Sequence, residues 1–88
     1  MKSMVRHDLY IREIADEKVV YDKANGKVHF LNQTATFIFD LCDGKNTQED
    51  IVKHLMDKYE VDRDKAERDV EEILRNLEKN IIIKRVDP

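Results

Sequence analysis

Two short apolar-rich segments, residues 19–21 and 28–31, stand on either side of a turn signal. Between them lie Asn25 and Gly26, which both tolerate the positive φ angles that a tight hairpin turn requires. The pattern therefore predicts two paired strands with a turn at Asn25 and Gly26.

Side chains alternate between two faces along the second of these predicted strands. One face carries Val28 and Phe30, and the other carries Lys27, His29 and Leu31. One face of this strand can be buried, and the other carries both apolar and polar side chains.

Residues 9–14 show partial alternation of apolar and polar positions, which predicts a further strand before the hairpin. This strand is expected to join the hairpin and complete a three-stranded antiparallel sheet.

A helical pattern begins directly after the hairpin, at Asn32. The Asn32 side chain can cap the helix by accepting a hydrogen bond from the backbone of Thr34 or Ala35. Apolar residues then recur at helical spacing: Ala35, Ile38, Phe39 and Cys42. We expect this helix to end at Asp43 and Gly44, since glycine favours the left-handed conformation that terminates helices.

Two more helices follow. Thr47 with Asp50 forms a capping-box-like start for the second helix, which is expected to end near Glu60. Asp62 can cap a third, longer helix that ends at Asn80, a residue that tolerates the left-handed C-cap conformation. The third helix offers two favourable i,i+4 ion pairs: Asp64 with Arg68 and Glu71 with Arg75.

The apolar stripe of the third helix is predicted to face the core, and it comprises Ala66, Val70, Ile73, Leu74 and Leu77. After that helix, residues 81–86 are rich in β-branched side chains and fit a final strand or a packed tail.

Three strands followed by three helices, the last two resembling a helix-turn-helix pair, predict an α+β fold of the winged helix-turn-helix type. The length of 88 residues suits one domain spanning residues 1–88. So few helices cannot cover a three-stranded sheet on every side. At least one strand should keep unpaired backbone groups, to which another strand can add.

Composition narrows the range of partners. The charged fraction is 40% and the net charge is -3, so the chain has no overall attraction for nucleic acid or for an acidic membrane. A DNA-binding winged-helix regulator is the alternative function that the layout suggests. The charge of residues 62–79 argues against DNA binding, because seven acidic residues outnumber five basic ones there. A recognition helix needs an excess of basic residues to contact the DNA phosphates.

The sequence offers no catalytic or metal-binding set. The single cysteine, Cys42, lies on a helical stripe and is interpreted as a small buried hydrophobe. His7, His29 and His54 are scattered without ligand spacing, so no metal and no cofactor are expected. With one cysteine, no apolar run of membrane-spanning length and no apolar signal core, a cytoplasmic location is expected.

The hairpin, the cap and the helix end together carry a family resemblance. Nine positions match the family pattern in order: Gly26, Leu31, Asn32, Thr34, Ala35, Leu41, Cys42, Asp43 and Gly44. On these residues, and on further similarity that reaches Leu77, the chain resembles the PqqD family, the pyrroloquinoline quinone synthesis protein D group. Members of this family bind precursor peptides.

The resemblance implies that the protein is a non-catalytic peptide chaperone with a winged-helix fold. The leader of a ribosomally synthesised precursor peptide would add as an extra strand along one edge strand, and a modifying enzyme, typically a radical S-adenosylmethionine (radical SAM) enzyme, would receive it. Pyrroloquinoline quinone biosynthesis is one pathway in which such a protein acts. The residues themselves leave the oligomeric state open, because an exposed edge strand and the hydrophobic tail at residues 81–83 could support a homodimer or equally pack within one chain.

The expected peptide-binding residues lie on the second hairpin strand and on the third helix. The docking strand comprises Lys27, Val28, His29, Phe30 and Leu31. On the third helix, Leu74 with Glu67, Glu71 and Glu78 could line the opposite wall of the groove, while Ala66, Val70, Ile73 and Leu77 belong to the core. The pattern leaves open which flank of this helix faces the strand.

Overall fold

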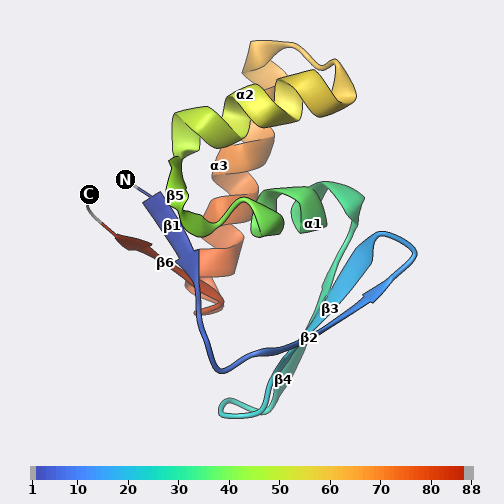
Figure 1. Ribbon diagram of the computed structural model, residues 1–88, viewed down its shortest axis with the longest axis vertical. Helices are drawn as coiled ribbons and strands as arrows, with labels where there is room; N and C mark the ends of the chain where they lie inside the picture. Colours follow the sequence, from blue (N-terminus) through green and yellow to red (C-terminus); the bar gives the residue numbers. More distant parts are fainter. Residues whose placement is uncertain (1, 87–88) are drawn as a thin grey trace.

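The computed structural model describes residues 2–86 and contains two three-stranded antiparallel sheets with three helices between and above them (Figure 1). The first sheet has the order β2-β3-β4 and is built from β2 (Tyr10–Ile14), β3 (Glu17–Asp22) and β4 (Lys27–Leu31). The second has the order β5-β1-β6 and is built from β1 (Lys2–Val5), β5 (Asp43–Thr47) and β6 (Ile83–Val86). The helices are α1 (Gln33–Asp40), α2 (Gln48–Tyr59) and α3 (Arg63–Lys79).

The predicted antiparallel sheet and the three predicted helices are confirmed, whereas the second sheet was not expected. The sequence pattern does not predict β1 and β5, because neither strand alternates clearly. Strand β5 reads Asp-Gly-Lys-Asn-Thr and has no apolar side chain. Pairing with β1 holds β5 as a strand, with Lys2 opposite Thr47 and Met4 opposite Asp43. Of the two options for the C-terminal segment, the strand is the observed one, paired to the other side of β1.

The turns of the first sheet differ from the expected pattern. Asn25 is not among the residues with positive φ, and the β3–β4 loop closes instead through a bond from the Gly26 amide to the Lys23 carbonyl (3.3 Å). The turn with two consecutive positive φ angles joins β2 to β3, at Ala15 (51°) and Asp16 (66°).

Each helix begins at the residue that the sequence indicated. Asn32 accepts a bond from the Ala35 amide (2.8 Å), and Asp62 accepts one from the Lys65 amide (2.8 Å). Thr47 and Asp50 form a complete capping box, in which each side chain accepts a bond from the other residue's amide. These contacts are local in the chain, which is why the sequence revealed them.

The predicted end of the first helix is wrong. Helix α1 stops at Asp40 with Leu41 as its C-cap, and Asp43 and Gly44 already belong to β5. Gly44 has φ +80° and lies against Met4, whose sulfur would be 3.5 Å from a β-carbon added to the glycine. That distance is an ordinary contact, so the reason for a glycine at this position is its positive φ and not a lack of space.

The predicted end of the third helix is displaced by one residue. Asn80 has φ -88°, and the left-handed residue is Ile81, with φ 60°. The Ile81 amide bonds to the Glu78 carbonyl (3.0 Å) and the Ile82 amide to the Leu77 carbonyl (2.9 Å), which together form a Schellman motif. Of the two predicted ion pairs, Glu71 with Arg75 is formed (2.8 Å), whereas Asp64 with Arg68 is not among the ion pairs of residues 2–86.

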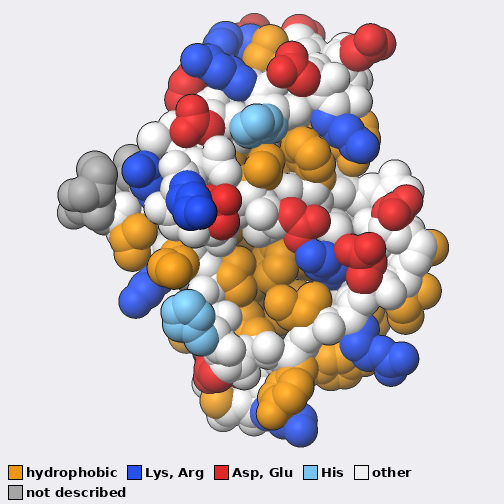
Figure 2. Space-filling view, in the orientation of Figure 1, with side chains coloured by type: hydrophobic (Ala, Val, Ile, Leu, Met, Phe, Trp, Pro, Cys, Tyr) orange, Lys and Arg blue, Asp and Glu red, His pale blue; other side chains and the backbone are white. Residues whose placement is uncertain are grey.

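The core lies where the helices meet both sheets. Its fully buried side chains come from every layer and include Val20, Ile38, Ile51, Leu55, Val70, Leu74 and Ile82. Cys42, with 2% of its surface exposed, is in this core as predicted. Charged side chains are scattered over the face shown in Figure 2, while hydrophobic ones gather near its centre.

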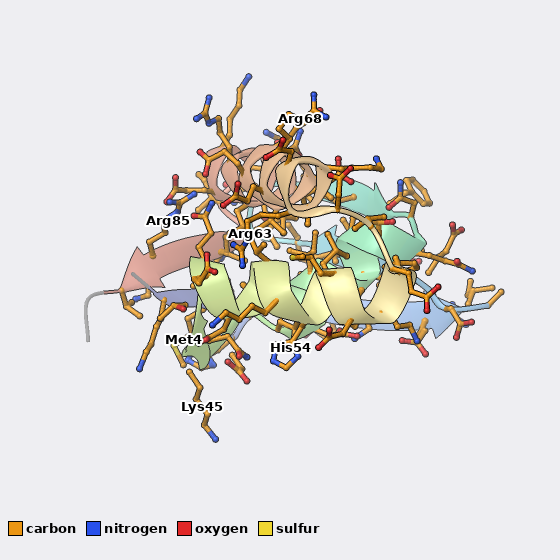
Figure 3. All side chains as sticks on the ribbon, turned by 90° about the horizontal axis from the view of Figure 1, so that it is seen from above. Met4, Lys45, His54, Arg63, Arg68 and Arg85 are labelled. Carbon is orange, nitrogen blue, oxygen red and sulfur yellow. The ribbon has the colours of Figure 1, made fainter. Side chains whose placement is uncertain are left out.

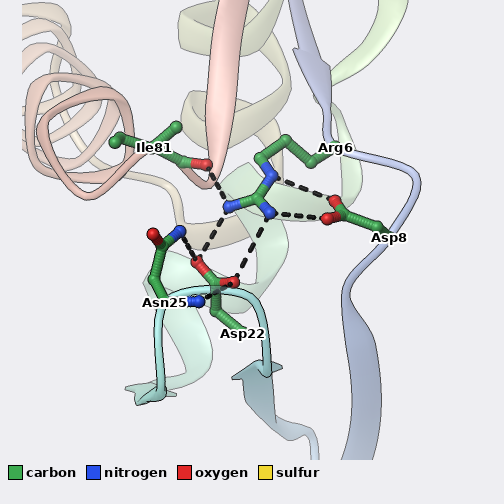
Figure 4. A network of polar contacts seen from close by, with 5 residues as sticks. All are labelled: Arg6, Asp8, Asp22, Asn25 and Ile81. Atoms are coloured by element: carbon green, nitrogen blue, oxygen red, sulfur yellow. Dashed lines mark hydrogen bonds and ion pairs between the residues drawn. The ribbon is translucent and has the colours of Figure 1, made fainter.

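A polar network joins three chain segments at one corner of the molecule (Figure 4). The Arg6 guanidinium donates to the carboxylates of Asp22 (2.8 Å) and Asp8 (2.7 Å) and to the carbonyl of Ile81 (3.2 Å). The Asn25 side chain also donates to Asp22 (2.8 Å), whose side chain is almost completely buried. The network therefore fixes the tip of the β3–β4 hairpin to the turn between α3 and β6.

Replacing Ile81 by glycine should stabilise the protein. A β-branched residue at positive φ is strained, and the Ile81 side chain is 59% exposed, so little packing is lost. We expect Ile81→Gly to raise the free energy of unfolding by about 1 kcal/mol, measured by urea denaturation. Ile81→Ala is the matched control because it removes the same exposed side chain but keeps a β-carbon. Equal stability of the two variants would contradict the strain.

Asp22 should contribute to acid sensitivity. Hydrogen bonds from Asn25, and then from Arg6, lower the pKa of Asp22 from 3.8 to about 2. A folded-state pKa below the unfolded value means that ionised Asp22 stabilises the fold above about pH 4, and that this stabilisation is lost as the pH falls from about 4 to 2.

Asp22→Asn, which cannot ionise, should therefore be less stable than the parent at pH 6 and should lose less stability between pH 5 and pH 2. Urea denaturation at a series of pH values measures both effects. Asp8→Asn is the control, because Asp8 contacts the same arginine from an exposed position. Parallel loss of stability in the parent and Asp22→Asn would rule out this role of Asp22.

Candidate functional site

Strand β4 forms one edge of its sheet. It pairs with β3 on one side, and no strand among residues 2–86 pairs with its other side. Val28 and Phe30 are 49% and 80% exposed, whereas Leu31 is 7% exposed. The face carrying Val28 and Phe30 is thus the solvent face, and His29 and Leu31 point inward.

The register shows which backbone groups of β4 are free. The two-residue turn at Ala15 and Asp16 makes Ile14 and Glu17 a hydrogen-bonded pair, so the backbone groups of Glu17 point toward β2. Backbone groups of successive residues point to opposite sides of a strand. Lys18, Val20 and Asp22 therefore direct their amide and carbonyl groups toward β4. Their partners on β4 are Lys27, His29 and Leu31. The amide and carbonyl groups of Val28 and Phe30 consequently point away from β3, toward the open edge.

Thr36 holds the end of β4 against helix α1. Its hydroxyl accepts a bond from the Lys18 amide (3.0 Å) and donates to the Leu31 carbonyl (3.2 Å). Lys18 also forms an ion pair with Asp40 at the other end of α1. The edge strand is therefore anchored to the helical layer at its C-terminal end.

A pocket of about 170 Å³ lies between the open edge and α3. Its near wall comes from the end of β4 and the start of α1, and comprises Phe30, Leu31, Asn32 and Ala35. Its far wall comes from one flank of α3, and comprises Glu72, Ile73, Asn76 and Leu77. The flank of α3 that faces the strand, which the sequence left open, is thus the one with Glu72, Ile73 and Asn76. We call this space the β4–α3 groove.

The structure does not bring the α3 residues chosen from the sequence to this groove. Leu74 is 1% exposed and lies in the core, while Ile73, expected in the core, is only partly buried and lines the pocket. Ala66, Val70 and Leu77 are buried as expected, so the core face of the helix differs from the prediction only in that Leu74 takes the place of Ile73. Ile73 thereby becomes available to a ligand in place of Leu74.

The three acidic candidates on α3 are engaged elsewhere. Glu71 accepts bonds from Gln48 (2.7 Å) and Arg75 (2.8 Å), which also lower its pKa. Glu78 pairs with Arg85 of β6 (3.5 Å), and Glu67 pairs with Arg63 (3.6 Å). Glu72 and Asn76 take their place in the groove. The helical spacing of Glu72 and Asn76 shows that they lie beside Ile73 and Leu77 on one flank of α3. The spacing does not show that this flank faces β4.

The solvent face of the β2–β3–β4 sheet is unusually apolar. The pairing register places six apolar side chains on it: Tyr10, Ile14, Val19, Tyr21, Val28 and Phe30. Arg12 and Glu17 are the charged residues of that face. We call this surface the outer sheet face. An exposed apolar surface of this kind is typical of protein contacts, because a solvated sheet face normally carries polar residues.

The chemistry of the isolated side chains gives no reactive centre. Burial raises the pKa of Cys42 to about 12, and its thiol donates to the Ile38 carbonyl (3.4 Å), so the thiolate that nucleophilic attack needs is disfavoured. In the part of the chain that the structure describes, no group of three or more His, Cys, Asp or Glu side chains could hold a metal ion. No helix within residues 2–86 has the length and apolar character needed to cross a membrane.

The basic side chains of α3 are interspersed with acidic ones. Arg68, Arg75 and Lys79 line the same surface pocket as Glu67, Glu71 and Glu72. Figure 3 shows Arg63 and Arg68 of α3 pointing in different directions. Arg63 pairs with Glu49 (2.9 Å), Lys65 with Asp69 (3.2 Å) and Arg75 with Glu71 (2.8 Å). Nothing in this distribution supports the alternative of a DNA-recognition helix.

Two solved structures resemble the chain over essentially its whole length. TbiB1, in complex with the TbiA(beta) leader peptide, has a TM-score of 0.83 and 26% identity, and the alignment covers 100% of both chains. A lasso peptide synthetase B1 complexed with the leader peptide has a TM-score of 0.83 and 25% identity over 97% of this chain and 100% of that one.

A comparison with curated proteins gives no match. Residues 17–83 match the model of a family described as Coenzyme PQQ synthesis protein D (PqqD). The match begins with β3 and ends at the first residue of β6, so it includes the open edge, the helix caps and the whole of α3. Because it spans well over half of the 88 residues, the chain belongs to the PqqD family.

Proposed function

We propose that the protein binds the leader of a ribosomally synthesised precursor peptide as an added strand on β4 and presents it to a modifying enzyme. The observation that carries this proposal is the open β4 edge beside the β4–α3 groove. Two similar proteins, TbiB1 and a lasso peptide synthetase B1, were solved with leader peptides, which supports the same class of ligand here.

Backbone and side-chain contacts have different tasks in this binding mode. The free amide and carbonyl groups of Val28 and Phe30 provide bonds that any extended peptide can make. Lys27, His29 and Leu31 complete the docking strand and hold it against β3. Selection comes from the groove, where alternate peptide side chains meet Ile73, Leu77 and their neighbours.

The protein itself is a non-catalytic adaptor in this proposal and needs no cofactor. Its benefit is effective concentration, since holding both the leader and the enzyme makes the modification step nearly intramolecular. The enzyme is of the radical SAM type or another peptide-modifying class, and pyrroloquinoline quinone synthesis is one such setting. The site of action is the cytoplasm, where a newly made precursor is available.

We assign the contact with the enzyme to the outer sheet face. A leader strand on β4 would extend the same sheet, so an enzyme resting on that face would touch both the adaptor and its peptide. A homodimer would have to use this face or the open edge, and it would compete with one of the two contacts.

Proline at position 28 should abolish leader binding while the fold is retained. The Val28 amide points away from β3, so its loss removes no bond within the sheet but removes one to an added strand. With the leader of a short peptide encoded beside the gene, we expect Val28→Pro to weaken binding at least tenfold by isothermal titration calorimetry. Val28→Thr is the matched control because it keeps the amide.

NMR titration of the parent locates the same contact. Chemical-shift changes should concentrate on β4 and on the Glu72, Ile73 and Asn76 flank of α3. Saturable binding with shifts elsewhere, or equal affinity of folded Val28→Pro and Val28→Thr variants, would exclude strand addition at this edge.

Polar substitutions on the outer sheet face should separate enzyme contact from leader binding. Tyr10 and Ile14 are 58% and 62% exposed and belong to β2, which lies across the sheet from the open edge. The double variant Tyr10→Ser, Ile14→Ser should bind the leader normally but fail to stimulate its modification, as measured by mass spectrometry of the product. If this variant stimulates modification normally, the enzyme contacts another surface. If the parent is a dimer in ultracentrifugation and the variant is a monomer, the outer sheet face binds a second copy of the chain instead.

A further inference from the structure

Glu72 is one of two acidic residues of α3 that form no ion pair within residues 2–86. Helix α3 carries Asp64, Glu67, Asp69, Glu71, Glu72 and Glu78. Glu67, Asp69, Glu71 and Glu78 are paired with basic residues, whereas Asp64 and Glu72 form no ion pair with any residue the structure describes. Of these two, Glu72 lies in the β4–α3 groove.

The surroundings of Glu72 combine an exposed carboxylate with an apolar pocket. Its side chain stands at the wall formed with Ile73, Asn76 and Leu77, opposite Leu31 and Ala35. Arg68 lies one turn earlier on α3 but not within ion-pair distance in the structure. Arg75 and Lys79 line a second surface pocket with Glu72, again without an ion pair to it. A peptide side chain that enters the β4–α3 groove therefore brings its neighbours close to a carboxylate that is not held in an ion pair.

We propose that Glu72 selects leader peptides that carry a lysine or arginine next to the apolar side chain in this pocket. The inference rests on the proposed function and specifies which peptides the groove accepts. The attraction acts across an exposed site, so it adjusts preference among leaders and does not supply the main binding energy.

The other end of the docking strand has the opposite charge. Lys27 is exposed and forms no ion pair within residues 2–86. From Lys27 to Leu31 the strand rises by about 13 Å, or four residues. A peptide added antiparallel to β4, as in the rest of this sheet, has its N-terminal part beside Leu31 and its C-terminal part beside Lys27. The preferred leader therefore has a basic residue followed, about four residues later, by an acidic one.

Selection from a random library tests this preference whichever peptide is the natural precursor. Random 20-residue peptides are selected by mRNA display against the full chain and against the Glu72→Lys and Glu67→Lys variants. Glu67→Lys is the matched control, because it makes the same change of charge on the same helix at a residue that pairs with Arg63 outside the groove. The parent and Glu67→Lys should enrich lysine or arginine beside an apolar residue, and Glu72→Lys should enrich aspartate or glutamate there.

Affinities of one selected peptide then give the size of the effect. Exchanging its basic residue for glutamate should weaken binding to the parent by about threefold to tenfold and strengthen binding to Glu72→Lys, as expected for an exposed charge pair. The difference should shrink in 0.5 M NaCl because exposed charges are screened.

The outcomes separate this inference from the proposed function. Unchanged preference in Glu72→Lys, with binding still abolished by Val28→Pro, would overturn the role of Glu72 and leave strand addition intact. Selected peptides that bind the Val28→Pro variant as well as the parent would overturn both.

Discussion

The position of the hairpin depends on the ion pair between Arg6 and the buried carboxylate of Asp22. Arg6 follows β1, Asp22 ends β3, and the same guanidinium reaches the carbonyl of Ile81 beyond α3. A buried carboxylate is costly unless it is fully hydrogen bonded, so Asp22 is stable there only while Arg6 and Asn25 surround it. One arginine thus determines where the hairpin tip lies relative to the end of α3. Because α3 and β4 are the two walls of the groove, this polar corner also sets the groove's shape.

The residues that identify the family serve mainly to build the frame. Asn32 caps α1, Cys42 fills the core, and Gly44 adopts the positive φ that β5 requires at that point. Strand β4 beside them carries no special side chain. In the proposed function, its contribution to binding comes from backbone groups that the fold leaves unpaired. An edge of this kind is normally a liability that proteins cover or charge. Here the edge is kept open next to a groove, which suits recognition of an extended peptide.

Two neighbouring surfaces with different character fit a protein that holds two partners. The β4–α3 groove combines an apolar pocket with a free carboxylate, as expected for a site that distinguishes one peptide from another. The outer sheet face is mostly apolar, with Arg12 and Glu17 as its two charged strand residues, as expected for contact with a folded protein. The two surfaces meet at Phe30, which is 80% exposed, projects from the outer sheet face and borders the groove. In the proposed binding mode, a peptide at the edge would therefore form part of the surface that meets the second partner.

The sequence by itself determined the local elements: the three strands of the first sheet, the caps at Asn32, Thr47 and Asp62, and the burial of Cys42. These follow from alternation, helical periodicity and hydrogen bonds between residues a few positions apart. Only the tertiary structure decided the second sheet, since β5 becomes a strand through pairing with β1, some forty residues away in the chain. It also decided the groove. Ile73 and Leu74 belong to the same apolar stripe, and the packing of α3 against both α2 and β6 buries Leu74 and turns Ile73 with Glu72 toward β4. The rotation of a helix about its axis is set by the surfaces on which it packs, and these come from distant parts of the chain.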